Sequence, residues 1–335
     1  MGKKDRTISA CKGIGIILMV IGHAGCPQPI HDFIYLFHMP LFFIITGFLF
    51  KTKYLVAPKT FLKRKISTLY KPFLIFNLIG LNIIFLNDYV IRNMFNLNQY
   101  LSRLIKIICF TKQYEIFGAT WFLKSLFVSN IVVFILLYIQ KKRGLSIRFP
   151  IIISLLFLII GYLIYTYRGI IIYDLQRELM IPILLMIGIL LKKYQPIIPY
   201  SNYLWPTCAF LMLLIASRFF TFDMIASEIV NPIVFLIFSI IGFYFIYSIS
   251  RKINKSKLIT YIGDNSLSIL LLHQIGFYSL QIIRTGTLQH YHKLHDNSYW
   301  IIYSIYAVFF SLLLNFIYNK IKNRHETGNN ISSVR

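Results

Sequence analysis

The sequence contains ten apolar runs, and the polar segments between them carry most of the basic residues. A backbone inside lipid must satisfy its hydrogen bonds within the segment, so repeated apolar runs of this length predict a bundle of membrane-spanning helices. We therefore expect an all-α, polytopic membrane protein with about ten transmembrane helices around a central cavity. The runs lie at residues 8–25, 33–50, 69–86, 121–139, 149–165, 179–191, 203–220, 230–249, 266–283 and 299–318.

The charge distribution predicts how the helices are oriented. Of the 335 residues, 57% are hydrophobic and 14% are charged, whereas about a quarter of the residues in a soluble domain are charged. If the N-terminus is cytoplasmic, 25 of the 35 Lys and Arg residues fall on the inner side. This distribution predicts that both termini are cytoplasmic. In so apolar a chain, the net charge of +24 indicates contact with membrane lipids, not a nucleic-acid partner.

A single membrane domain is expected over residues 1–320. Residues 321–335 form a polar stretch that we expect to be a disordered cytoplasmic tail. The longest outer segment, residues 87–120, mixes basic and aromatic side chains. That pattern is typical of an amphipathic segment on the membrane surface, and it also suits a lid over a binding site.

Two ionisable residues in the first apolar run are candidates for function, because such groups are costly inside a bilayer. Lys12 and His23 are eleven residues apart. This spacing is about three helical turns, so both fall on one face, about 16 Å apart along the axis. His23 can exchange a proton near neutral pH, or it can be a neutral histidine bonded to a neighbouring helix. Lys12 can bind phosphate, or it can mark the inner membrane boundary.

Several short elements along the chain resemble the acyltransferase family 3 membrane proteins, in particular the sugar O-acetylase branch. The elements follow the order of that family from Lys12 to about His273, and the sequence departs from it at Thr46, at Thr68 and at Leu184-Leu185. The matching elements are Lys12 ten residues before His23, FHMPLFF (Phe37–Phe43) before Thr46-Gly47-Phe48, FLKRKISTLYKPF (Phe61–Phe73), Trp121-Phe122-Leu123, Gly188 before Lys192-Lys193, and Gly263-Asp264-Asn265-Ser266-Leu267 before His273.

The resemblance implies an enzyme of a bacterial inner membrane. Such an enzyme would move an acyl group, in this branch an acetyl group, from acyl-CoA to a hydroxyl of a lipid-linked sugar or a surface polysaccharide. His23 would be its general base. The resemblance implies acyl-CoA as a substrate, with no tightly bound cofactor and no metal, and it allows a homo-oligomer. The alternative is a transporter that moves a glycan or a lipid-linked precursor without bond chemistry.

Other residues can serve such a reaction, and each also has a structural explanation. Arg64 and Lys65 can bind the phosphates of acyl-CoA, although basic residues are ordinary in an inner loop. His38 can orient His23, hydrogen-bond the thioester or simply pack in the core. His273, inside the ninth run, can line the cavity or bond a neighbouring helix. Trp121 can stack on a sugar ring or belong to an aromatic belt.

A catalytic histidine usually needs a second group that orients it. Acidic residues are the usual choice, and the chain has only 11 of them. Glu178 can serve this purpose or contact the acceptor. The sequence does not distinguish between the acids that are suitably placed, which are Asp32, Glu115, Glu178 and Asp264.

Overall fold

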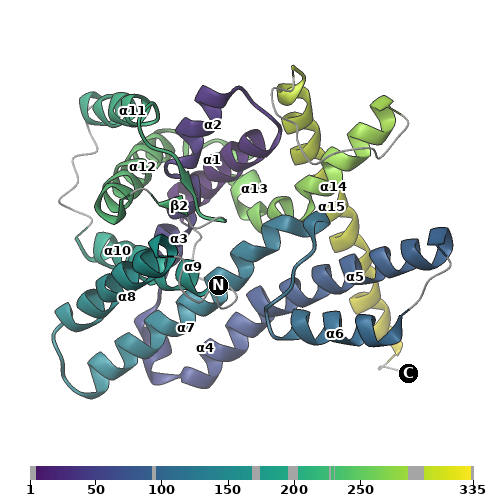
Figure 1. Ribbon diagram of the computed structural model, residues 1–335, viewed down its shortest axis with the longest axis horizontal. Coiled ribbons are helices and arrows are strands. Elements are labelled where there is room, and N and C mark those ends of the chain that lie inside the picture. The colour runs from purple at the N-terminus through teal and green to yellow at the C-terminus, as the bar shows by residue number, and fades with distance from the viewer. Residues whose placement is uncertain are drawn as a thin grey trace. The chain divides into compact units, whose positions relative to one another are not determined.

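The computed structural model describes residues 5–92, 96–167, 174–194, 203–225, 228–229, 231–285 and 298–332. Nearly all of the backbone in these residues is helical. The strands that they contain, β1 (Phe222–Asp223) and β2 (Glu228–Ile229), form an antiparallel pair with Phe222 opposite Ile229. The chain is an all-α, multi-pass membrane protein, as its apolar runs predict (Figure 1).

Every expected apolar run contains a helix. Among the described residues, eight helical segments are long and apolar enough to cross a membrane. The sixth and seventh runs form shorter helices, α10 (Pro182–Lys193) and α11 (Leu204–Ala216). The eight long segments are Arg6–His23, Gln28–Phe48, Pro58–Val90, Ile116–Lys142, Arg148–Thr166, Pro232–Ile253, Ser266–Arg284 and Trp300–Asn323.

The remaining elements include short helices in segments that were expected as connections. Helix α6 forms in the long outer segment and lies beside α5 (Figure 1), and α13 forms between the eighth and ninth spans. The other helices are α1 (Arg6–His23), α2 (Gln28–Tyr35), α3 (His38–Phe48), α4 (Pro58–Lys65), α5 (Lys71–Arg92), α6 (Leu97–Ile108), α7 (Trp121–Lys142), α8 (Arg148–Thr166), α9 (Leu175–Met180), α12 (Pro232–Ile253), α13 (Lys257–Asp264), α14 (Ser266–Thr285) and α15 (Trp300–Ser332).

The chain divides into two compact units. The first unit combines Met1–Gln28 with Ile253–Arg335, so it contains α1, α13, α14 and α15. The second unit is Pro29–Lys252, which contains the helices from α2 to α12. Each unit therefore has its own packed interior.

In the first unit, two glycines let α13 lie directly against α1. A Cβ atom on Gly263 would overlap the backbone carbonyl of Ser9, and one on Gly13 would overlap the carbonyl of Ile259. A hydrogen bond of 2.7 Å from the Ser9 hydroxyl to Asp264 joins the same two helices. Small residues permit this close approach where helices meet within a membrane protein. The packing fixes the N-terminal half of α1.

In the second unit, α3 and α10 are joined in the same way. A Cβ atom on Gly47 would overlap the backbone of Leu185, and one on Gly188 would overlap the backbone of Ile44. The second apolar run is interrupted between Tyr35 and His38, where α2 ends and α3 begins. Proline lacks a backbone N–H and suits the first turn of a helix, which is where Pro40 lies.

Candidate active site

The first unit brings two histidines together. His23 is the last residue of α1, and His273 lies inside α14. The Nδ1 atom of His23 is 2.9 Å from Nε2 of His273, and their ring centroids are 5.1 Å apart. His273 is fully buried, whereas His23 is partly exposed. The pair is therefore accessible from the His23 side.

The hydrogen bonds of His273 define the proton positions in the pair. Its Nδ1 atom is 2.9 Å from the carbonyl oxygen of Leu270 and 3.1 Å from that of Ile269. A carbonyl only accepts, so Nδ1 of His273 carries the proton, and the neutral ring presents a lone pair on Nε2. His23 must then donate from Nδ1 to that lone pair. Neutral His23 consequently has its own lone pair on Nε2, where it can accept a proton.

The acids proposed as orienting groups have other partners in the structure. Asp264 accepts from Ser9, Asp32 lies 3.4 Å from His31, and Glu178 accepts from Ser125. The side chain of Glu115 lies outside the described residues. The group that the structure places on His23 is thus another histidine, His273. Sequence spacing does not predict that His23 and His273 form a pair, since the two residues are 250 positions apart.

Lys12 lies on the same uninterrupted helix as His23 and is partly exposed. The eleven-residue spacing therefore holds in the structure, with α1 helical throughout. Lys12 is one turn from Ser9, which contacts α13, whereas His23 contacts α14. The two ionisable groups accordingly belong to opposite ends of α1.

His38 lies in the second unit and is buried. Its Nδ1 atom is 2.9 Å from the carbonyl oxygen of Ile34, so this nitrogen donates and Nε2 carries the lone pair. Its ring also lies beside Tyr35, which stacks on His31 with centroids 3.7 Å apart. His38 thus belongs to a row of three rings at the corner between α2 and α3.

Arg64 and Lys65 lie at the end of α4, just before a π-helical turn at Ile66–Tyr70. Arg64 donates to the hydroxyl of Tyr54 at 2.6 Å. The ammonium group of Lys65 lies 5.5 Å from the centroid of the Phe61 ring. The hydrogen bond from Arg64 to Tyr54 ties α4 to the short 3-10 helix Thr52–Val56, whereas the contact of Lys65 with Phe61 lies within α4.

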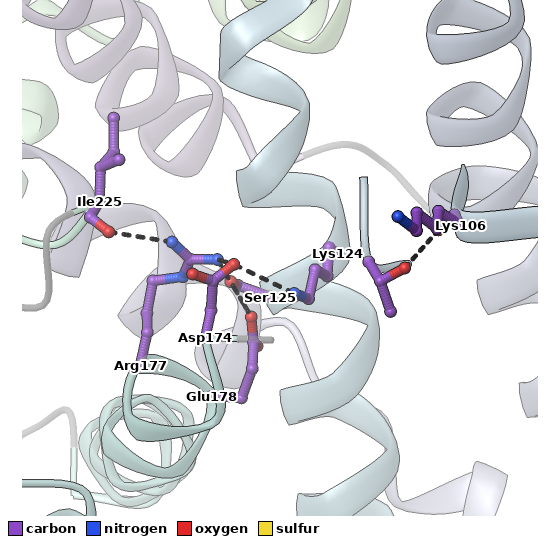
Figure 2. A network of polar contacts seen from close by, with 8 residues as sticks. Lys106, Lys124, Ser125, Asp174, Arg177, Glu178 and Ile225 are labelled. Atoms are coloured by element: carbon purple, nitrogen blue, oxygen red, sulfur yellow. Dashed lines mark hydrogen bonds and ion pairs between the residues drawn. The ribbon is translucent and has the colours of Figure 1, made fainter. Parts of the chain in front are cut away.

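Trp121 and Glu178 belong to one buried polar cluster in the second unit. Figure 2 shows Glu178 with Arg177 and Ser125. The guanidinium of Arg177 lies over the Trp121 indole, with Cζ 4.9 Å from the ring centroid. Arg177 is 2% exposed and Glu178 is 7% exposed. The Oε1 atom of Glu178 accepts from Ser125 at 2.8 Å and lies 3.5 Å from Arg177.

Asp174 connects this cluster to α7. It accepts from Arg177 at 2.7 Å and from Lys124 at 3.2 Å, and Arg177 also donates to the carbonyl of Ile225 at 3.1 Å (Figure 2). Burial raises the pKa of the Asp174 carboxyl, but the charges of Arg177 and Lys124 outweigh burial and hold it below its usual value. The cluster therefore joins the start of α7, the start of α9 and the segment that contains Ile225.

Two atoms in the cluster lack a hydrogen-bond partner within the described part of the chain. They are Nε of Arg177, a donor, and Oε2 of Glu178, an acceptor. Buried polar atoms are normally paired. A hydroxyl group can accept from one atom and donate to the other, so the cluster offers the chemistry needed to hold an alcohol or a water molecule.

Comparison with known proteins identifies the family. The family model described as an acyltransferase domain, that of the acyltransferase family 3, matches residues 5–317. The chain belongs to this family. The match covers both units, from the start of α1 into α15, so it takes in the histidine pair and the Trp121 cluster. No curated protein and no solved structure matches the chain.

This acyltransferase has functional candidates that sequence reasoning missed. Lys124, Asp174 and Arg177 were not among the expected site residues, although Lys124 and Arg177 are buried. The sequence did carry one indication of these residues, which is that a charged residue lies at the edge of an apolar run. If such a residue is buried, it requires a partner. Three further histidines, at positions 290, 292 and 295, lie outside the described residues.

Proposed function

We propose that this membrane acyltransferase is an O-acetyltransferase of the bacterial cytoplasmic membrane. Acetyl-CoA, or another acyl-CoA, would be the donor. A hydroxyl of a lipid-linked sugar or of a surface polysaccharide would be the acceptor. The observation that carries the proposal is the histidine pair, because it leaves the lone pair of His23 on Nε2.

The proposed reaction uses His23 as both base and acid. Nε2 of His23 takes the proton of the acceptor hydroxyl while the oxygen attacks the thioester carbonyl. A C–O bond forms, the C–S bond then breaks, and His23 returns the proton to the departing thiolate. His273 would hold the imidazole by accepting from Nδ1, which also favours the imidazolium formed during the reaction. Direct transfer needs no acyl-enzyme.

In the second unit, Trp121 and Glu178 are proposed acceptor contacts. Trp121 presents an aromatic surface of the kind that sugar rings stack against. Glu178 and Arg177 offer the acceptor and donor atoms for one hydroxyl group. His38 is proposed to support the reaction from the ring row at α2, and Lys12 to attract the negatively charged donor. Homo-oligomer formation stays a prediction.

The test is acceptor-dependent release of free CoA thiol by the purified protein in nanodiscs. The wild type is compared with His23→Ala and His38→Ala, with lipid-linked sugars as acceptors. We expect His23→Ala to lose at least about a hundredfold in kcat, the usual contribution of a general base. A His23→Ala protein with undiminished turnover would contradict the assigned base.

The same assay separates the enzyme from a transporter. A transporter would move the glycan across a sealed vesicle without acyl-CoA and would release no thiol. Translocation that needs no acyl-CoA, together with no thiol release from the wild type, would overturn the proposal. Mass spectrometry of the acceptor provides the positive result, which is the added mass of one acyl group.

A further inference from the structure

The second unit contains a cavity whose rim is strongly basic. Its volume is about 680 Å³, and it is formed where the C-terminal ends of α3, α7 and α10 meet the 3-10 helix Thr52–Val56. We name it the lysine pocket. Its lining consists of Gly47, Phe50, Lys51, Thr52, Lys53, Leu55, Leu137, Gln140, Ile147, Ile189, Lys192 and Lys193.

The walls of the lysine pocket are held in place by packing. Gly47 packs against the backbone of Leu185, which fixes α3 on α10, and the lining residues Leu55 and Leu137 are buried. The side-chain amide of Gln140 donates to the carbonyl of Leu145 at 2.6 Å, which orders the turn after α7. The floor of the pocket is consequently a preformed surface.

Arg64 fixes the remaining wall. Its hydrogen bond to Tyr54 holds the 3-10 helix that supplies Thr52, Lys53 and Leu55 to the pocket. Lys192 donates to the carbonyl of Phe50 at 3.4 Å and so closes one part of the rim. Arg64, expected as a phosphate ligand, is better placed here to position the pocket than to line it.

The chemistry of the lining indicates an anion with several charges and an apolar part. Four of the lining residues are lysines, and the described residues that line the pocket include no acidic side chain. Phe50, Leu55 and Ile147 give it an apolar interior. A phospholipid with one phosphodiester offers a single negative charge, whereas a phosphomonoester alone carries roughly −1.5 to −2 at pH 7. Four cations match a ligand with several phosphates, and the apolar side chains can pack against the face of a flat aromatic base.

We propose that the lysine pocket binds the phosphates and the adenine of the CoA part of the donor. The inference rests on the proposed function, which supplies acyl-CoA as a substrate. Lys51, Lys53, Lys192 and Lys193 contact the phosphates, and the apolar interior receives the base. All four lysines lie in segments that the charge bias places on the cytoplasmic side, where acyl-CoA is available.

The experiment measures binding of CoA to the purified protein in nanodiscs by isothermal titration calorimetry. The pocket variant replaces Lys51, Lys53, Lys192 and Lys193 by Gln. The control variant removes the same number of charges at exposed positions that do not line the pocket, namely Lys59, Lys141, Lys142 and Arg143. We expect the pocket variant to raise the Kd for CoA at least about tenfold and the control variant less than about threefold.

Each outcome has a distinct meaning. Equal Kd values in the two variants would overturn the pocket and leave the proposed function intact. A wild type that binds no CoA would contradict both. If the pocket variant loses bound phosphatidylglycerol in native mass spectrometry while its Kd for CoA is unchanged, the pocket is a lipid site and the inference is wrong. The double variants Lys51→Gln/Lys53→Gln and Lys192→Gln/Lys193→Gln repeat the measurement if the full variant does not fold.

Discussion

Nδ1 of His23 lies 2.9 Å from Nε2 of His273, so a buried imidazole occupies the place where many catalytic histidines have a carboxylate. A neutral acceptor orients the ring without adding a charge to the interior. A neutral acceptor suits a membrane protein, because a buried carboxylate would need compensating partners of its own. The Nδ1 atom of His273 donates to the carbonyls of Ile269 and Leu270.

The first prediction tests this orienting role. His273→Gln retains an oxygen that can accept from Nδ1 of His23, whereas His273→Phe retains a ring without an acceptor. We expect His273→Phe to lower kcat at least about tenfold while the KM for acyl-CoA changes less than about twofold. His273→Gln should keep most of the activity. The measurement is steady-state thiol release, with thermal unfolding of both variants as the control for folding.

A purely structural role for His273 would give a different pattern. Both variants would then lose activity in proportion to their loss of stability, and Gln would not differ from Phe in kcat. Equal kcat values for the two variants would therefore reject the assignment.

The second prediction concerns the contact between α1 and α13. Gly263→Ala forces a methyl group into the carbonyl of Ser9, and no flexible side chain there can move aside. We expect a loss of about 1–3 kcal/mol in the free energy of unfolding. Gly276→Ala is the comparison variant, because its methyl group would approach the Cα atom of Ala307 at 2.9 Å, a milder overlap than that with the carbonyl of Ser9.

Gly276→Ala should lose less stability than Gly263→Ala, since its overlap is smaller and Ala is favoured over Gly in a helix by about 1 kcal/mol. Unfolding in mixed micelles of increasing denaturing detergent gives both values. Equal losses at Gly263 and Gly276 would show that the α1–α13 contact is looser than the structure describes.

Local sequence patterns predicted the helices, but not which side chains would come into contact when the helices pack. Apolar runs determine spans because the bilayer permits few alternatives. The partner of His23 depends on how α1 and α14 pack, and no local signal encodes that. Arg64 illustrates the same limit, because no local pattern indicates that the 3-10 turn brings Tyr54 to it. Glu178 was predicted as a candidate, but its partners Arg177 and Ser125 were not.

The third prediction tests the cluster around Trp121. Arg177→Met leaves the buried carboxylate of Glu178 without its nearest cation, and we expect a loss of about 3–5 kcal/mol in the free energy of unfolding. Arg177→Met/Glu178→Gln removes both charges and should lose less than the sum of the two single variants. A double-mutant cycle from detergent unfolding measures this coupling. Additive losses would mean that the two side chains do not interact.

The fourth prediction is a pH dependence that arises at Asp174. Because Arg177 and Lys124 hold its pKa below the usual carboxyl value, the folded state favours the ionised form. The stabilisation is fully present above the unfolded pKa, about 3.9, and is lost as the pH falls through the lower folded pKa. Its size should stay below about 1 kcal/mol, since the side chain of Asp174 is 44% exposed and solvent screens it.

Asp174→Asn removes this titrating group while keeping the shape of the side chain. We expect the variant to unfold at a lower temperature than the wild type by a constant amount between pH 5 and pH 8, a window that lies above the unfolded carboxyl pKa of about 3.9. Below about pH 4 the difference should shrink, because the wild-type carboxyl becomes protonated and loses its ion pairs with Arg177 and Lys124. Scanning calorimetry across this range gives the difference directly. A difference that keeps its full size well below pH 3 would show that Asp174 acts through hydrogen bonds that do not need its charge.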